Sequence, residues 1–428
     1  MVINKIYIVK NFIFLIFFTI LIANSSYSQQ SLFSQTGPNA KALGQDNNFQ
    51  ICKNYTDHWT RADCRVGNFS EAEKVINGIM RSITPSKDPI NFKFMQNPPI
   101  DLINKVDDYI SKYPTMGFLI IKNGEIVVER YQYDRKINMI FRGFSVSKTY
   151  IAMLVGIAQQ KGFIKSLDDK VSNYWNEIKN SPYGEVTIKE LLRMSSGVDG
   201  GEYSSGKHQM WIELYKKENL SQPNKFNEYL NNLRSNGVKG NFRYNDQDTE
   251  ILSRVLTKVT NKNITTLTSE WLWQPMGGRG VGKWIYATTD DIETGSGGLH
   301  ASLNDYGRFG VLLANDGKYK DTQVIPLNFI LEATDIKKIP KSHIGLNPGN
   351  AFQYSYGYQT WTQPNKERTF CALGHYGQLI CVQPSSKIVM VQVAAGDHDS
   401  FKNSFGNMGS ALNSLWQNIL KDLGGSID

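Results

Sequence analysis

Ser145 and Lys148 are the two side chains whose types and spacing point most directly to chemistry. They stand three residues apart, just before an apolar run over 151–158 with a helical period, so they should share one face of a first helical turn. A hydroxyl beside an amine can act as a nucleophile, and the N–H groups of a helix N-terminus favour a developing oxyanion. The pattern therefore predicts Ser145 as the nucleophile and Lys148 as its proton acceptor.

The Ser-x-x-Lys pattern alone is weak, because it occurs twice. Residues 204–207 repeat it in a Gly/Ser-rich stretch that does not favour a helix. The strained Gly-x-Ser-x-Gly turn of other serine hydrolases occurs nowhere in the chain. The first copy is favoured by the elements around it.

The elements near Ser145 form a recognisable order. A helical pattern covers 100–113, and β-rich runs at 117–122 and 125–130 flank Asn123-Gly124, which predicts a hairpin with a type I′ turn. Further helices are expected around 187–194, 248–256, 271–278, 305–313 and 405–420, and strands at 356–361, 369–373, 378–382 and 387–393. Strands near both ends with helices between them imply one sheet built from distant segments, with an α-helical insertion.

This order of motifs resembles the serine β-lactamase and penicillin-binding-protein superfamily. It is most similar to the β-lactamase-related hydrolases that include 6-aminohexanoate-dimer hydrolase and certain esterases. Residues 145–148 fit the first box of the superfamily, and residues 191–197, 272–277 and 305–310 resemble its recurrent segments. The resemblance runs from about residue 100 to the C-terminus. It implies an α+β fold (an α/β sandwich) of the β-lactamase/D,D-peptidase type, with an antiparallel sheet flanked by helices.

The resemblance also assigns a third catalytic residue. Tyr244-Asn245-Asp246 stands where the family has Tyr-x-Asn, so Tyr244 is expected to pass the proton of the nucleophile to the leaving group. A phenol near an ammonium can have its pKa lowered enough to act as a base. Asp246 occupies the position of the family's asparagine. Asn245, one residue earlier, is therefore expected to make the hydrogen bonds of that asparagine. The alternative is that Tyr244 has a structural role and packs the α-helical insertion onto the core.

The third box of the family, Lys/His-Thr/Ser-Gly on a strand, has two possible alignments here. One places His375-Tyr376-Gly377 there, and the favoured one places Ala372-Leu373-Gly374 there. In the second alignment the N–H of His375 joins that of Ser145 as the oxyanion hole, and Gly374 lets the substrate lie close to the strand. A plain strand turn with a surface histidine is the alternative.

The substrate implied by this alignment is a small ester or amide. The lysine and hydroxyl that bind a substrate carboxylate in β-lactamases and transpeptidases are missing, which weakens the case for penicillin-like substrates. The leading hypothesis is an exported serine hydrolase that works through an acyl-enzyme. The alternatives are a D,D-peptidase or β-lactamase of the cell wall, and a non-catalytic relative that binds peptidoglycan or protein.

The chain has 428 residues, 40% of them hydrophobic, which suffices for one large two-lobed fold. Residues 1–28 read as a signal peptide, because Lys5 and Lys10 precede a short apolar run. That predicts export to the periplasm or medium without stable membrane insertion, an uncleaved anchor being the alternative. The remaining ranges are an N-terminal extension at 29–99 and a hydrolase domain at 100–428, with a sheet lobe from 100–145 and 350–428 and a mainly helical lobe at 146–349.

The four cysteines permit disulfides in an exported protein. Cys52–Cys64 and Cys371–Cys381 are the simplest of three connectivities, and buried free thiols are an alternative for the second pair. No metal motif is present, so no metal or other cofactor is expected. The net charge of +8 is mild and no basic block interleaves with aromatic residues, so no nucleic-acid partner is expected either. The sequence leaves the oligomeric state open.

Overall fold

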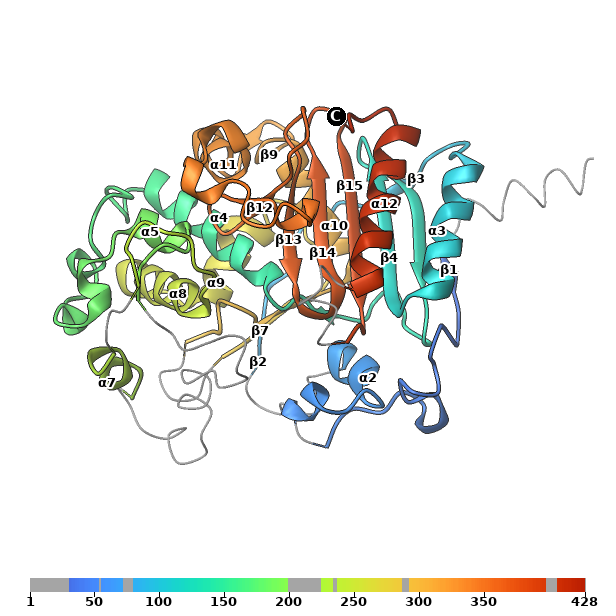
Figure 1. The fold of residues 1–428 in the computed structure, drawn as a ribbon, viewed down its shortest axis with the longest axis horizontal. Coiled ribbons are helices and arrows are strands. Elements are labelled where there is room, and N and C mark those ends of the chain that lie inside the picture. Colours follow the sequence, from blue (N-terminus) through green and yellow to red (C-terminus); the bar gives the residue numbers. More distant parts are fainter. Residues whose placement is uncertain are drawn as a thin grey trace, which may run out of the picture.

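The main β-sheet joins strands from both ends of the chain (Figure 1). This computed structural model describes residues 31–53, 55–71, 80–198, 225–233, 237–286, 292–397 and 406–427. The predicted signal peptide, the second Ser-x-x-Lys copy at 204–207 and most of the mixed region at 200–240 lie outside these ranges. Within them, nine strands form the main sheet in the order β1-β5-β4-β15-β14-β13-β12-β11, with β3 also paired to β5.

The predicted hairpin forms the second and third strands of the sheet, counted from the β1 edge. Strands β4 (Thr115–Lys122) and β5 (Glu125–Tyr131) are antiparallel, and both Asn123 and Gly124 have positive φ, as a type I′ turn requires. Strand β4 pairs on its other edge with β15 (Ile388–Ala394), which is followed in the sheet by β14 (Gln378–Gln383) and β13 (Phe370–Gly374). The sheet built from distant segments is confirmed.

Residues 356–361 were expected to form one strand, and that prediction is wrong. The structure has two short strands here, β11 (Ser355–Tyr356) and β12 (Trp361–Thr362), which pair antiparallel. Gln359, between them, has a positive φ of 51°, so the chain turns back. The aromatic residues suggested a strand, but the turn at 357–360 is too short to leave a recognisable loop.

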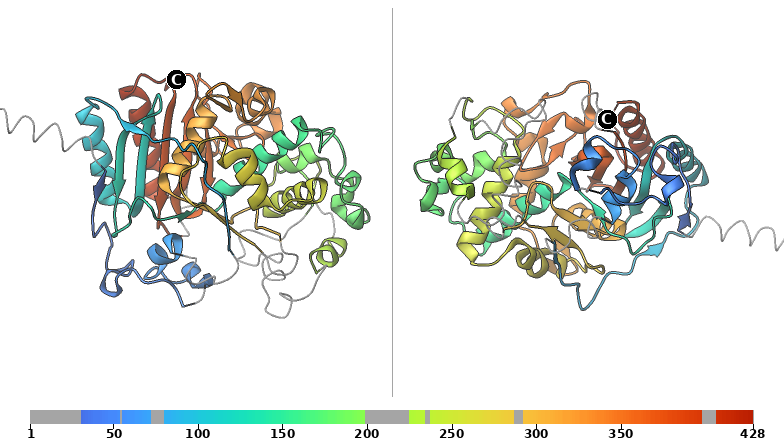
Figure 2. Two further views of the ribbon diagram at one scale, coloured as in Figure 1. Left: turned by 180° about the vertical axis from the view of Figure 1, so that it is seen from behind. Right: turned by 90° about the horizontal axis from the view of Figure 1, so that it is seen from below.

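Two hydrophobic clusters fill the two faces of the sheet, because successive strand residues point to opposite sides. On one face, Phe118 and Ile120 of β4 pack with α3 (Ile100–Lys112) and α12 (Gly406–Asp422). On the other face, Leu119 and Ile121 pack in the cluster that contains α4 (Val146–Gln160) and α10 (Leu303–Ala314). The layers of helix, sheet and helix are visible in Figures 1 and 2. The predicted α+β class is confirmed.

The remaining helices mostly lie beside the sheet, at the far end of α4 (Figure 1). Helix α8 (Asp246–Thr260) packs against α4 and α5, begins two residues before its predicted start and continues four beyond its predicted end. Helix α10 falls within the range expected for the helical lobe, yet it packs on the sheet through β4, β14 and β15. The others are α5 (Ile188–Leu192), α7 (Lys225–Asn231), α9 (Ile264–Thr268), a π-helix (Ser269–Trp273) and α11 (Leu327–Thr334).

The N-terminal extension wraps around the main domain. Strands β1 (Leu32–Phe33) and β3 (Lys93–Phe94) pair parallel with β5. Strand β2 (Met80–Ser82) instead joins a smaller sheet in the order β2-β7-β8-β6, whose other members are β7 (Lys283–Ile285), β8 (Leu299–Ala301) and β6 (Phe141–Arg142). The extension also forms α2 (Arg65–Ser70), and a hairpin of β9 (Lys318–Tyr319) and β10 (Thr322–Gln323) follows α10.

Both of the simplest cysteine pairings are present. Cys52 is bonded to Cys64 in the extension, and Cys371 is bonded to Cys381 across the ladder of β13 and β14. The alternative of free thiols for the second pair is therefore wrong. In the described part of the chain, no helix is both long and apolar enough to cross a membrane.

Candidate active site

Ser145 lies at the N-terminus of α4, where the sequence predicted a nucleophile. It occupies the cap position directly before Val146 and keeps part of its surface exposed. Phe144, the residue before it, has a positive φ of 47°, which is uncommon for a bulky residue and is typical of functional turns. The turn into α4 therefore presents the hydroxyl of Ser145 at the helix end.

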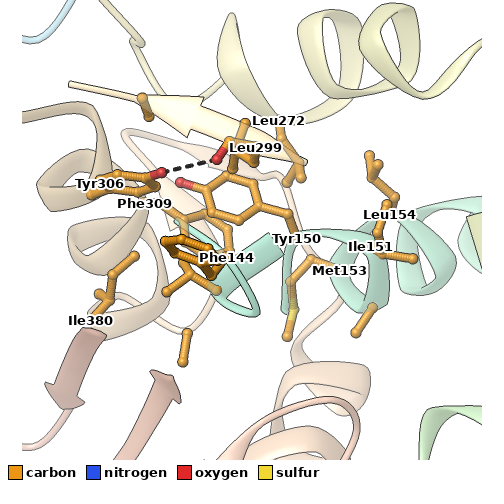
Figure 3. Close-up of a cluster of buried hydrophobic side chains, with 14 of the residues drawn as sticks. Phe144, Tyr150, Ile151, Met153, Leu154, Leu272, Leu299, Tyr306, Phe309 and Ile380 are labelled. Atoms are coloured by element: carbon orange, nitrogen blue, oxygen red, sulfur yellow. Dashed lines mark hydrogen bonds between the residues drawn. The ribbon is translucent and has the colours of Figure 1, made fainter. Parts of the chain in front are cut away.

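The first turns of α4 are fixed in the core that Figure 3 shows. Tyr150 stacks on Phe309 of α10 with ring centroids 3.7 Å apart. The hydroxyl of Tyr306 donates to the carbonyl of Phe141 at 2.8 Å and to that of Leu299 at 3.3 Å. The first contact ties α4 to α10 and the hydrogen bonds tie α10 to β6 and β8, so the position of Ser145 depends on packing against α10 and, through it, on the small sheet.

Lys148 is buried directly beside Ser145. Its side chain is 1% exposed, and its Nζ donates to Ser145 Oγ at 2.8 Å and to the carbonyl of Ser296 at 2.7 Å. Its third neighbour is Asp246, whose Oδ1 lies 2.7 Å from Nζ. Two hydrogen-bond acceptors and one carboxylate therefore surround the nitrogen, an environment that suits an ammonium.

The pKa of Lys148 is raised above its ordinary value. Burial by itself disfavours the charged form, but the charge of Asp246 and then Tyr244 outweigh that effect. The resting side chain is therefore held as an ammonium. Asp246 stands at the third position of the box, where the family has asparagine, and its carboxylate is thus the group that holds Lys148 in the charged form.

Tyr244 completes the group. Its hydroxyl shares hydrogen bonds with Ser145 and with Lys148, and the Nζ of Lys148 lies 5.2 Å from the centroid of its ring. Trp361 stacks on the ring at 5.9 Å and Tyr356 meets it edge-on at 6.0 Å. Burial raises the pKa of Tyr244 more than Lys148 lowers it, so the net direction is opposite to the lowering expected from the ammonium alone.

Asn245 lies outside this group, and its predicted role does not fit its position. Its Oδ1 accepts from the N–H of Gln247 as the cap of α8, and its Nδ2 donates to Asp248 and Tyr183. The side chain is buried and fully engaged in that network. Asp246, one residue further on, faces Lys148 because it begins the helix that Asn245 caps.

Gly374 and His375 lie at the end of β13 beside the turn that carries Ser145. A Cβ added to Gly374 would be 2.1 Å from the carbonyl oxygen of Gly143, so the two backbones approach as closely as glycine permits. Residues 372–374 belong to β13, whereas His375–Gly377 form a tight turn in which Tyr376 has a φ of 62°. This geometry favours the alignment of Ala372-Leu373-Gly374 with the third box.

The sequence reasoning missed Ser296 and Glu250. Glu250 of α8 accepts from the N–H of Ser296 at 2.9 Å and pairs with Arg254 at 3.0 Å, all three being buried. Ser296 in turn offers its carbonyl to Lys148. Residues 295–298, Gly-Ser-Gly-Gly, were the available signal, because such a run marks a close backbone approach.

Comparisons with known proteins agree with this fold and arrangement. A family model described as Beta-lactamase matches residues 102–412. The chain belongs to the beta-lactamase family of serine hydrolases.

Individual relatives are distant. A 6-aminohexanoate-dimer hydrolase from Paenarthrobacter ureafaciens is 23% identical over 294 residues, covering 66% of this chain and 72% of the relative. A solved structure from Bacillus anthracis, provisionally named a 6-aminohexanoate-dimer hydrolase, has a TM-score of 0.69 at 23% identity and covers 87% of this chain and 96% of its own. A family VIII carboxylesterase has a TM-score of 0.55 at 16% identity, with coverage of 76% and 99%. These structural likenesses show the fold.

Proposed function

We propose that this protein hydrolyses ester or amide bonds through an acyl-enzyme on Ser145. The observation that carries the proposal is the hydrogen bond of 2.8 Å from Lys148 Nζ to Ser145 Oγ, with Tyr244 bound to both partners. A nucleophile, an ammonium and a phenol in mutual contact at a helix N-terminus form a proton-transfer group. The names of the relatives, a 6-aminohexanoate-dimer hydrolase and a family VIII carboxylesterase, support a hydrolase of this kind.

The proton route follows from the charges. Asp246 holds Lys148 as an ammonium, so the hydroxyl of Tyr244 is the group that must lose a proton before the reaction. The resulting phenolate takes the proton of Ser145 Oγ as that oxygen attacks the carbonyl carbon. Tyr244 then donates this proton to the leaving alcohol or amine. Water repeats the sequence on the acyl-enzyme and releases the acid.

The oxyanion would be held by two backbone N–H groups, those of Ser145 and His375. The close approach of Gly374 to Gly143 supports this assignment, because it brings the end of β13 against the turn before α4. Preorganised N–H donors of this kind commonly contribute about 3–4 kcal/mol of transition-state stabilisation.

We expect a substrate that carries no charged group next to the ester or amide bond that is cleaved. Ala372 and Leu373 offer no group for a carboxylate, and Asp246 adds a negative charge beside Lys148. Both features disfavour the carboxylate-bearing substrates of penicillin-type enzymes. Uncharged esters and amides carry no such penalty.

Replacing Ser145 with alanine tests the proposal. Hydrolysis of p-nitrophenyl acetate should fall to background in Ser145→Ala, with an unchanged circular-dichroism spectrum. Labelling by a fluorophosphonate probe should map to the peptide that contains Ser145. Ser414→Ala, an exposed serine on α12, is the control and should retain full activity. Hydrolysis that survives in Ser145→Ala would refute the assignment.

We propose in addition that the protein is exported after removal of residues 1–28. The apolar run in that segment and the two disulfides support this location, since disulfides persist in oxidising compartments. N-terminal sequencing of protein recovered from the periplasm or medium should begin near Gln29. Recovery of the full-length chain from the cytoplasm or membrane would contradict it.

A further inference from the structure

The segment from Cys52 to Glu71 of the N-terminal extension packs on the turn that follows β13. The ring of Phe69 lies 4.9 Å from that of Tyr376, and the ring of Trp59 lies 5.6 Å from that of His375. His375 is the residue whose N–H is assigned to the oxyanion hole. The extension therefore contacts the proposed site, although no pattern in its sequence indicates a role.

The same segment also contacts the residue that precedes the nucleophile. Phe144, which precedes Ser145, meets Phe69 edge-on at 5.0 Å and lies 6.2 Å from the ring of His58. The rings of Phe144 and Tyr376 are themselves 5.3 Å apart. The segment thus contacts both backbone turns whose N–H groups would hold the oxyanion.

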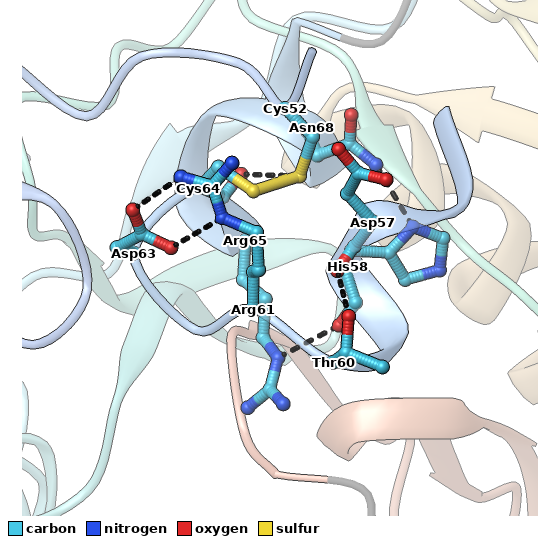
Figure 4. The surroundings of a disulfide bond; sticks show 9 residues. All are labelled: Cys52, Asp57, His58, Thr60, Arg61, Asp63, Cys64, Arg65 and Asn68. Atoms are coloured by element: carbon cyan, nitrogen blue, oxygen red, sulfur yellow. Dashed lines mark hydrogen bonds and ion pairs between the residues drawn. A yellow bond between two sulfur atoms is a disulfide. The ribbon is translucent and has the colours of Figure 1, made fainter. Parts of the chain in front are cut away.

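One disulfide and several hydrogen bonds hold the segment in place (Figure 4). The disulfide joins Cys52 to Cys64, and the Nε of Arg65 donates to the carbonyl of His58 at 3.1 Å. The Nη1 of Arg65 reaches the carbonyl of Gly396, also at 3.1 Å, which ties the segment to the chain beyond β15. The side chains of Asn68 and His58 are hydrogen-bonded at 3.0 Å.

Trp59 stands out from its buried surroundings. It is 39% exposed, whereas His58 is 1% exposed and every residue of α2 is buried. Among the described residues it is the only tryptophan in the group of exposed large hydrophobic side chains. A partly exposed indole that contacts His375, beside the proposed site, is suited to contact a ligand.

We propose that Trp59 is a substrate-contacting residue that selects for apolar groups on the ester or amide. The indole packs against the apolar part of the acyl or leaving group while the carbonyl oxygen faces the N–H of His375. The Cys52–Cys64 disulfide acts as a positioning device, because it closes the segment that carries Trp59. The inference rests on the proposed hydrolase function and adds to it the substrate preference.

Steady-state kinetics on two ester series test the proposal. One series keeps p-nitrophenol as the leaving group and varies the acyl group from acetyl to butyryl to phenylacetyl. The other keeps the acetyl group and varies the leaving group from methanol to 1-naphthol. In Trp59→Ala, kcat/KM should fall about tenfold for the largest member of one series, mainly through KM, and stay within about twofold for the smallest. Trp59→Phe should recover part of the loss.

The disulfide variant tests the positioning role. Cys52→Ser/Cys64→Ser should reproduce the size-dependent loss of Trp59→Ala, with kcat/KM falling more for the largest ester than for the smallest. Trp271→Ala is the matched control, because this half-exposed tryptophan stacks on Phe163 beyond the opposite end of α4 and should change neither series.

Two results separate the possible failures. If Trp59→Ala lowers kcat/KM equally for all esters, or changes none of them, Trp59 does not contact substrate and the inference is overturned. In either case, continued fluorophosphonate labelling at Ser145 and turnover by the wild type would show that the proposed hydrolase function stands. A wild type that hydrolyses no ester of either series would instead overturn the function on which the inference rests.

Discussion

The ion pair between Lys148 and Asp246 makes a quantitative prediction about pH dependence. Asp246→Asn keeps the shape of the side chain and removes its charge. The substitution should lower the pKa of Lys148, because burial then acts without the opposing carboxylate. It should lower the pKa of Tyr244 as well, because the charge of Asp246 is one of the causes that raise it.

The size of the effect follows from the separation of 2.7 Å between Lys148 Nζ and Asp246 Oδ1. Coulomb's law gives about 1.5 kcal/mol for that distance at the dielectric constant of water and about 6 kcal/mol at an effective constant of about 20. The smaller energy already corresponds to about a tenfold change in an equilibrium constant. Even the smaller value is measurable.

The assay is the pH profile of kcat/KM on a small ester. The reactive form has lost one proton from the pair formed by Lys148 and Tyr244, so activity in the wild type should rise with pH until that proton is gone. In Asp246→Asn the rising limb should move to lower pH by at least about one unit. At a fixed pH on that limb, kcat/KM should then be roughly tenfold higher than in the wild type. Glu270→Gln, which removes a carboxylate from an exposed pair with Lys262, should leave the limb in place. An unmoved limb, or one displaced to higher pH, would refute the reasoning.

Three further substitutions test other parts of the site. Gly374→Ala should lower kcat about 100-fold by forcing β13 away from the turn before Ser145, whereas Gly349→Ala, with open space around it, should have no effect in the same assay. Burial raises the pKa of Asp248 from 3.8 to about 7, so its contribution to stability falls as pH rises between these values, by up to about 4 kcal/mol. Asp248→Asn should therefore unfold at higher urea than the wild type at pH 8, with a smaller difference at pH 5. Glu250→Ala removes a buried carboxylate that pairs with the buried Arg254 and should cost about 3–5 kcal/mol in urea unfolding, and Glu250→Gln should cost less.

Local patterns in the sequence predicted those features that local chemistry determines. Asn123-Gly124 permits positive φ at two successive residues, which few other pairs do, so the hairpin was predictable. Helix α5 could also be predicted, because Thr187 and Glu190 form the reciprocal cap that their spacing indicates. The contact between Ser145 and Lys148 needed only one helical turn.

Features that depend on distant contacts were not predictable. Asn245 and Asp246 are adjacent polar residues, and only the start of α8 decides which of them faces Lys148. The extension has weak periodicity because its helix α2 is buried on every side, so no single apolar stripe marks it. The role of Trp59 depends on a contact with His375 more than 300 residues away, which no local pattern can indicate.

The pairing of β4 with β15 has a consequence for how the protein is made. Residues 117–122 meet their partners at 388–393 only after almost all of the chain between them has been synthesised. Until then β4 presents an unpaired apolar edge, which is a template for association with other chains. Such long sequence separation also slows folding, because the loop between the strands must close first. We therefore expect nascent chains to need protection from aggregation, and Ser145 to become reactive only as the last strands join the sheet.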